Sequence, residues 1–197
     1  EPEVLDEALM RHASGLRILA ACRDVATANR IQPLHVTHIL EALRRQYPWV
    51  VVDTGSWLDD RTSAILDLAD TVLLVTTPEM TSLRAARLFL ELALEEGYDR
   101  SKVHLVINRA DLLGAIPIQD IEQHLSLKAF ATLSDDSALV TYSVNRGVPL
   151  VLSHKRKPLA RGLRNLATQI LRNEVPQEDR PLRAFRLFRR SGSGSKP

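Results

Sequence analysis

Four short polar segments stand directly after apolar runs in this sequence. The run "WVVVDT" (49–54) passes from apolar residues into Asp53, and Gly55 follows Thr54 at once. The other three polar segments are Thr76–Pro78, Asn108–Asp111 and Leu133–Asp136. A carboxylate oxygen is a ligand that Mg²⁺ accepts, and Mg²⁺ usually takes few ligands from protein. The Thr54-Gly55 step is small enough for backbone N–H groups to approach a phosphate.

Asp53 also has a simpler explanation, because it could cap the next turn or the helix that starts near residue 59. For an isolated apolar strand that ends in Asp, this capping role is favoured, since short motifs give many false matches. The succession Asp-Thr-Gly, Thr-Pro-Glu and Asn-Arg after three apolar runs instead favours a nucleotide site. Asp59, Asp60 and Arg61 are separately expected to cap the helix over 59–69.

Apolar runs of strand length alternate with longer helical patterns along the chain. The predicted strands are 16–22, 49–54, 71–78, 102–109 and 129–133. The predicted helices are 33–46, 59–69, 80–96, 117–125, 136–146 and 156–173. This alternation predicts an α/β fold with a doubly wound, mostly parallel sheet. The unbroken apolar run before Asp53 predicts a strand that is covered on both faces. Because ligands bind beyond the carboxyl ends of parallel strands, we expect the four polar segments at one rim.

The composition divides the chain into a mildly acidic domain, residues 1–174, and a basic tail, residues 175–197. The net charge is +2, yet the stretch from Arg180 to the end holds five Arg, one Lys and no acid. Apolar residues of the tail fall three apart and Arg residues lie on another flank of the same predicted helix: Leu182, Phe185 and Phe188, with Arg183, Arg186 and Arg190. This pattern is typical of segments that bind anionic membranes. Contact with DNA phosphates and a solvated end without a partner are the alternatives, and DNA is the weaker one.

The single cysteine excludes an internal disulfide and favours a cytoplasmic location. Apolar runs stay well short of the roughly 20 residues that a membrane-spanning helix needs. We therefore expect a cytoplasmic protein whose tail can contact the inner face of the membrane.

The residues 47–98, followed by "KVHLVINRAD" and "SVNRGVPL", resemble the MinD/ParA class of P-loop ATPases. The closer resemblance is to the CpaE/TadZ branch, which is linked to assembly and positioning of Flp/Tad-type pili. It covers about residues 10–172. The resemblance implies ATP and Mg²⁺ as cofactors, an ATP-controlled homodimer and pilus or secretion components as partners. It also leaves two alternative functions, a non-hydrolysing scaffold of the same fold and a DNA-partitioning ATPase.

The resemblance also implies roles for individual residues. Asp53 matches the Walker B or switch II Asp near Mg²⁺, and Thr54 and Gly55 match the turn that senses the terminal phosphate. Asn108 matches the residue that reads the adenine edge, and its neighbour Arg109 is expected to cover the base. The loop that wraps the adenine and ribose corresponds to Leu133, Ser134, Asp135 and Asp136. Ser134 stands where the family usually has Pro, which leaves the shape of that loop open.

The largest departure from the family is that no phosphate-loop sequence is present. There is no GKT or GKS, and the only "GSGS" (192–195) lies in the tail without a strand before it. Phosphoryl transfer depends on positioning and charge neutralisation, so this chain alone is expected to be inactive. The chain is either the C-terminal part of a longer ATPase or a non-hydrolysing relative. We favour the first, with residues 1–14 matching the helix that follows switch I in complete members.

Overall fold

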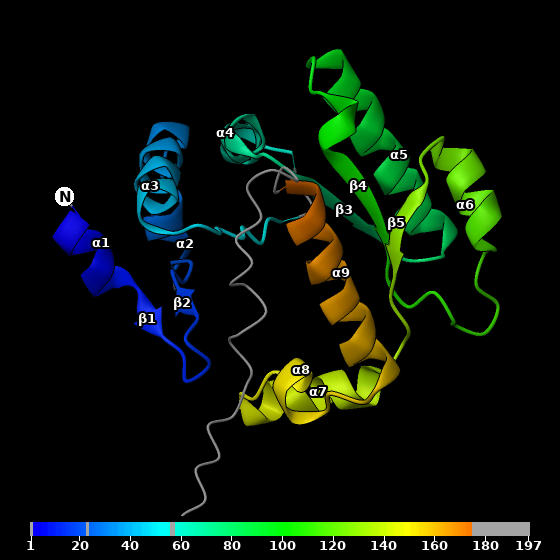
Figure 1. Ribbon diagram of the computed structural model, residues 1–197. Helices are drawn as coiled ribbons and strands as arrows, with labels where there is room; N and C mark the ends of the chain where they lie inside the picture. The colour runs from blue at the N-terminus through cyan, green and yellow to red at the C-terminus, as the bar shows by residue number, and fades with distance from the viewer. Residues whose placement is uncertain (1, 23, 56–57, 175–197) are drawn as a thin grey trace, which may run out of the picture. The chain divides into compact units, whose positions relative to one another are not determined.

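The computed structural model describes residues 2–22, 24–55 and 58–174 (Figure 1). The tail residues proposed to contact a membrane therefore lie outside the described residues. The chain forms two compact units. Unit 1 comprises residues 1–74, 81–104 and 124–126, and unit 2 comprises residues 75–80, 105–123 and those from 127 onward.

Unit 1 is mainly helical. Its elements are α1 (Pro2–Ala8), β1 (Met10–Arg11), β2 (Arg17–Ile18), α2 (Val25–Ala28), α3 (Pro33–Gln46), α4 (Asp60–Leu68), α5 (Met80–Glu95, with its first residue in unit 2) and the 3₁₀ turn η1 (Arg100–Lys102). Helix α3 begins with Pro33, where the fixed φ of proline suits the first turn. Its buried residues Leu40 and Leu43 form a core with Leu9, and Ile65 and Leu68 of α4 pack against that core. An amphipathic helix pair thus buries its apolar faces together.

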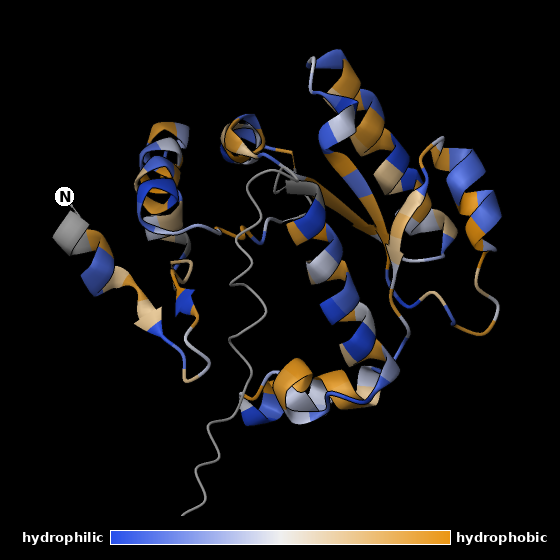
Figure 2. Ribbon diagram, in the orientation of Figure 1, coloured by the Kyte–Doolittle hydropathy of each residue, from blue (hydrophilic) through white to orange (hydrophobic). Residues whose placement is uncertain are grey.

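The sheet consists of β3 (Val72–Thr76), β4 (Val103–Ile107) and β5 (Ala129–Thr132), in the order β3-β4-β5. Strands β4 and β5 are parallel, with Leu105 opposite Ala129 and Ile107 opposite Thr132. The carboxyl-terminal half of β4 is almost fully buried, and Figure 2 shows this strand as hydrophobic. A parallel strand with this burial needs cover on both faces. The predicted α/β class is therefore confirmed.

Four helices follow β4: α6 (Ile118–Leu125), α7 (Ser137–Arg146), α8 (Leu150–Ser153) and α9 (Pro158–Glu174). Figure 1 shows α7 and α8 beside the first turns of α9, within unit 2. Leu159 of α9 forms a core with Val106 and Leu133. A Cβ added at Gly162 would lie 3.1 Å from a methyl group of Leu133. The absence of a side chain at Gly162 therefore lets α9 approach the end of β5 closely.

Two strand predictions are wrong. The predicted strand 16–22 is reduced to Arg17–Ile18, which pairs antiparallel with Met10–Arg11 in a hairpin turned at Gly15 (φ 91°). Residues 49–54 form no strand, and within the described residues none pairs with them. Val51 is 91% exposed, so the expected cover on both faces is also wrong for the structure as described. Apolar side chains favour a strand, but only a hydrogen-bonded neighbour fixes one.

The helix that the resemblance implies for residues 1–14 is limited to Pro2–Ala8, because Met10–Arg11 belong to the hairpin. The remaining predicted elements are confirmed with ends shifted by a few residues at most. The two glycine-ended helices end as expected: Gly97 (φ 81°) follows α5, and Gly147 (φ 63°) caps α7 in the left-handed conformation. The four-residue helices α2 and α8 were not predicted, since one turn carries too little periodicity to be recognised.

Candidate functional site

Three of the four predicted polar segments meet at the carboxyl ends of the strands in unit 2. The backbone N–H of Asn108 donates to the carbonyl of Thr76 over 2.8 Å, which joins the ends of β4 and β3. The N–H of Leu133 donates to Ile107 over 2.8 Å, and the N–H of Ala110 donates to Leu133 over 2.9 Å. The segments 76–78, 108–111 and 133–136 therefore form one polar rim.

The chain turns sharply at Arg109, whose φ of 55° is unusual for a residue other than glycine. The side-chain Oδ1 of Asn108 accepts a hydrogen bond from the Arg109 N–H over 3.0 Å and holds this turn. The left-handed conformation costs about 1–2 kcal/mol for such a residue. The turn directs the Arg109 side chain to Asp135 in the loop that follows β5.

Asp135 joins that loop to the turn. Its carboxylate accepts from Arg109 Nε over 2.8 Å and from the Ser137 hydroxyl over 2.7 Å. Its backbone N–H donates to Asp111 Oδ1 over 2.6 Å. The Ser137 hydroxyl, and next the Arg109 guanidinium, lower the pKa of the Asp135 carboxyl below its usual value. These bonds fix the loop 133–136 against the segment 108–111.

Asp136 has a separate structural role, since its carboxylate caps α7 by accepting from the Leu139 N–H over 3.2 Å. Both carboxylates of the loop are thus already engaged in holding it. Within the described residues, the side-chain NH₂ group of Asn108 has no protein acceptor. An amide edge with a free donor beside a planar guanidinium can bind the hydrogen-bonding edge and the face of a heteroaromatic base.

Asp53, Thr54 and Gly55 belong to unit 1, where all three are exposed in an irregular segment. Their contact with magnesium and phosphate remains a prediction. In the described part of the chain, no group of three His, Cys, Asp or Glu side chains could hold a metal ion. Magnesium in nucleotide sites is bound by one or two carboxylates together with phosphates and water, so a single Asp53 carboxylate suits that chemistry.

Asp59, also in unit 1, is the N-cap of α4. Its carboxylate accepts from the N–H and the hydroxyl of Thr62, each over 2.9 Å, and pairs with Arg61 over 2.9 Å. The Thr62 N–H is the main cause that lowers the pKa of Asp59 to about 2. The predicted capping role is confirmed, and these contacts give Asp59 a structural function.

The sequence interpretation placed Asp111 at the rim but missed that it anchors the loop after β5. Its position in "NRAD", three residues after Asn108, was the available signal. The left-handed turn at Arg109 was missed as well, because no glycine marks it. Ligands of α/β proteins bind beyond the carboxyl ends of parallel strands, so this polar rim is the candidate ligand site.

Comparison with solved structures places this fold among MinD/ParA-like P-loop NTPases. The ParA family ATPase from Chlorobium tepidum TLS superimposes with a TM-score of 0.80 at 22% identity, covering 85% of this chain and 70% of that one. The septum site-determining protein MinD of Pyrococcus horikoshii OT3, in complex with Mg-ADP, gives 0.72 at 18% identity, over 84% and 68%. At these identities the similarity establishes the fold.

Sequence comparison supports the same class. The septum site-determining protein MinD of Thermotoga maritima is 27% identical over 180 residues, which are 88% of this chain and 65% of that protein. The chain therefore spans just under two thirds of that relative. No protein family model matches the sequence. Fold and sequence are thus both similar to those of MinD/ParA-class ATPases, while the CpaE/TadZ branch remains a prediction.

Proposed function

We propose that the protein containing this chain binds Mg-ATP and acts as an ATP-controlled homodimer that positions a pilus or secretion component at the membrane. The observation that supports nucleotide binding is the amide of Asn108, held between the ends of β3 and β5 with the Arg109 guanidinium beside it. The pilus or secretion cargo follows from the resemblance to the CpaE/TadZ branch alone.

The rim of unit 2 fits the base and ribose part of such a ligand. Asn108 offers its NH₂ donor to a base edge, and Arg109 offers the plane of its guanidinium. The backbone groups of Leu133 already hydrogen-bond to Ile107 and Ala110 and so hold the loop in place. The Ser134 backbone would supply a further donor and acceptor in this loop, whose carboxylates are already engaged. Asp53 would hold Mg²⁺, which neutralises phosphate charge when bound, and Gly55 would approach the terminal phosphate.

The phosphate loop, on this proposal, is supplied by chain upstream of residue 1. The 197 residues contain no Gly-rich Lys-Ser/Thr loop, and the MinD relative from T. maritima is longer than the matched region. The exposed residues Val51 and Val52, which pair with no strand of the described residues, are what we expect where a further strand pairs in the complete protein. This chain by itself should then bind nucleotide weakly and hydrolyse none.

The test uses the full-length protein and its variants Asp53→Ala and Asn108→Ala. We expect Asn108→Ala to weaken ATP binding about tenfold, the effect of one lost hydrogen-bonding group. Asp53→Ala should remove Mg²⁺-dependent ATP turnover. Asn165→Ala, an exposed asparagine of α9, is the matched control and should change neither. Equal ATP affinity in the Asn108→Ala and Asn165→Ala variants would refute the base-binding role.

A non-hydrolysing scaffold is the second candidate, and the missing phosphate-loop sequence favours it. Full-length protein without turnover and without an upstream loop would establish that alternative. A DNA-partitioning role requires DNA binding that weakens steeply with salt. The membrane part of the proposal rests on the tail, through Leu182, Phe185, Phe188 and the arginines between and after them, and these residues lie outside the described ones.

A further inference from the structure

The charges of the chain are strongly segregated along its length. Residues 1–136 hold 21 acidic and 13 basic residues, whereas residues 137–173 hold no acidic residue. The basic residues of this second stretch are Arg146, Lys155, Arg156, Lys157, Arg161, Arg164 and Arg172. The stretch forms α7, α8 and α9 in unit 2. We call its first six basic residues the α7–α9 basic surface.

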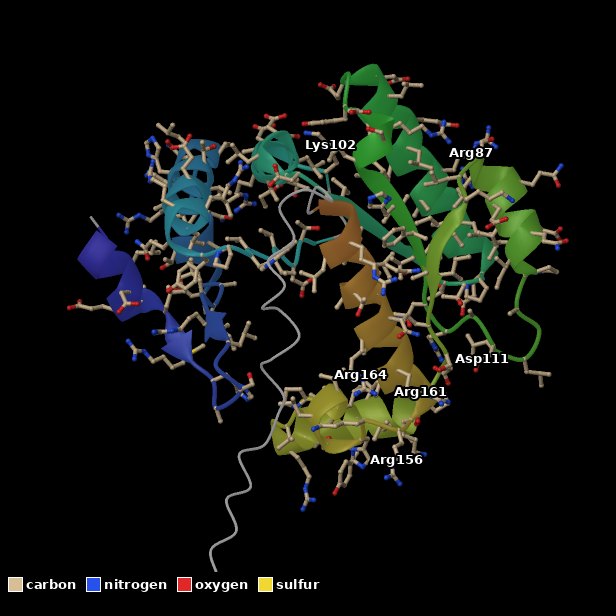
Figure 3. The ribbon with its side chains drawn as sticks, in the orientation of Figure 1. Arg87, Lys102, Asp111, Arg156, Arg161 and Arg164 are labelled. Atoms are coloured by element: carbon tan, nitrogen blue, oxygen red, sulfur yellow. The ribbon has the colours of Figure 1, made fainter. Side chains whose placement is uncertain are left out.

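The α7–α9 basic surface is open to solvent. All six side chains are exposed. Every ion pair observed among the described residues involves cations outside this surface. Figure 3 shows Arg156, Arg161 and Arg164 around the junction of α7, α8 and the start of α9. The six exposed cations repel one another, and a negatively charged partner would relieve that repulsion.

Contacts link these cations into one continuous surface. The Arg146 guanidinium lies over the ring of Tyr142, 5.0 Å from its centroid, and donates to the Tyr142 hydroxyl. The Tyr142 ring meets the His154 ring edge to face at 5.9 Å. Lys155 follows His154, and its carbonyl accepts a hydrogen bond from Arg164. These contacts connect the end of α7, the segment 154–155 and the second turn of α9.

The cations do not converge on one point. Lys155, Arg156 and Lys157 are consecutive residues between α8 and α9, and all three are exposed. Together with Arg146 of α7 and Arg161 and Arg164 of α9, they are spread over three segments of the chain. Their arrangement instead suits an extended surface that presents many negative charges.

Exposed aliphatic side chains lie on the same elements. Val144 of α7 is 72% exposed, and Val148 and Leu152 are each 44% exposed. Figure 2 shows hydrophobic segments of α7 and α8 next to hydrophilic ones. Phosphates of a nucleic acid would give these aliphatic groups no partner. The ring of Tyr142 already contacts the Arg146 guanidinium and the ring of His154.

An anionic lipid surface can bind both the exposed cations and the exposed aliphatic side chains. Lys and Arg can reach phosphate and carboxylate headgroups while short aliphatic side chains enter the interfacial layer. We propose that the α7–α9 basic surface is a membrane-contacting face of the folded part of the chain, specific for anionic lipids. This face adds to the membrane role proposed for the tail, and it does not depend on nucleotide binding.

The test measures co-sedimentation of the full chain with vesicles, without nucleotide. One set contains phosphatidylcholine only, and the other contains about one third phosphatidylserine. The patch variant carries Lys155→Gln, Arg156→Gln and Lys157→Gln, which lie outside the helices and leave their hydrogen bonds intact. The matched control carries Arg30→Gln, Arg45→Gln and Arg84→Gln, three exposed arginines of unit 1. Both variants change the net charge equally.

We expect the wild-type chain to bind only the anionic vesicles. The patch variant should lose about 100-fold in partition coefficient, whereas the control should stay within about threefold of wild type. Circular dichroism should show the same helix content in all three proteins. Leu152→Gln should weaken vesicle binding relative to wild type, and the relative loss should be larger at high salt. Salt screens the charges, so that aliphatic insertion contributes a larger share of the binding.

Several results would overturn the proposal. Equal losses in the patch and control variants would show that net charge alone matters. No binding to anionic vesicles, or tighter binding to duplex DNA at the same salt, would assign the surface to another partner or to none. A tail variant with Arg183, Arg186 and Arg190 changed to Gln provides the third comparison: if it loses all binding and the patch variant loses none, the folded face is not involved. ATP turnover of the full-length protein is measured separately, so failure here leaves the proposed nucleotide function untouched.

Discussion

The side chain of Asp59 illustrates how much one carboxylate can organise locally. It accepts two hydrogen bonds from Thr62 and pairs with Arg61, while Arg61 also donates to the carbonyl of Ala28 over 3.2 Å. One capped helix start is thereby connected to a segment 33 residues earlier in the chain. The lowered pKa of about 2 reports how strongly the folded state favours the ionised carboxylate.

The pKa of Asp59 leads to a pH prediction. Because its folded-state pKa lies below the ordinary value of 3.8, the contribution of Asp59 to stability is present above pH 3.8 and is lost as the pH falls toward 2. We expect Asp59→Ala to lower the urea midpoint at pH 7, and the difference from wild type to shrink between pH 4 and pH 2. Asp60→Ala, one residue later in the same first turn, is the control. A pH-independent difference would contradict the role of the ionised cap.

At the level of the helices, two helix ends are followed by different residues that both have a positive φ. Ser126 follows α6 with φ 49°, and Gly147 follows α7 with φ 63°. Glycine adopts this conformation without a Cβ penalty, whereas serine does not. No atom lies close enough to Gly147 to hinder an added Cβ. The effect of a side chain at Gly147 therefore depends on the backbone conformation and not on a steric clash.

Opposite substitutions at these helix ends should have opposite effects. We expect Ser126→Gly to raise the free energy of unfolding by about 0.5–1 kcal/mol, and Gly147→Ala to lower it by about 1 kcal/mol. Urea unfolding followed by circular dichroism measures both. The same sign for both variants would show that something other than the left-handed conformation decides stability here.

Strand β4 is the most deeply buried element, and its centre should be the least tolerant of truncation. Leu105 is fully buried, so Leu105→Ala should cost about 3 kcal/mol through lost burial and an unfilled cavity. Leu113→Ala is the matched control, because Leu113 is fully exposed in the loop after β4. Its unfolding free energy should change by less than about 0.5 kcal/mol. A comparable loss in both variants would argue against β4 as the central core strand.

Ligand binding should be visible at the scale of the whole protein. We expect Mg-ATP at about 100 times its Kd to stabilise the full-length protein by about 2.7 kcal/mol, which thermal unfolding measures as a higher Tm. Removal of Mg²⁺ by EDTA should reverse most of this increase, because the Asp53 carboxylate acts through the metal. An equal Tm increase with and without EDTA would show that ATP binding does not require magnesium.

The sequence predicted most elements because their signals are local. Pro33 marks the start of α3, while Gly97 and Gly147 mark the ends of α5 and α7. Continuous apolar runs identified β3 and β4 in the same way. The site was anticipated in part for the same reason, since polar residues after parallel strands must share one edge. The acid-free stretch 137–173 was equally visible in the sequence, but its significance was not recognised.

The sequence by itself thus determined the longer helices to within a few residues, the three strands of the sheet and the residue types at its rim, because each depends on neighbours in the chain. Tertiary structure decided the rest. It left 49–54 without a strand partner, it joined Arg109 to Asp135 across 26 positions, and it used Asp111 to hold the loop after β5. Pairing between distant segments depends on the positions of both partners in space, and no local pattern encodes that.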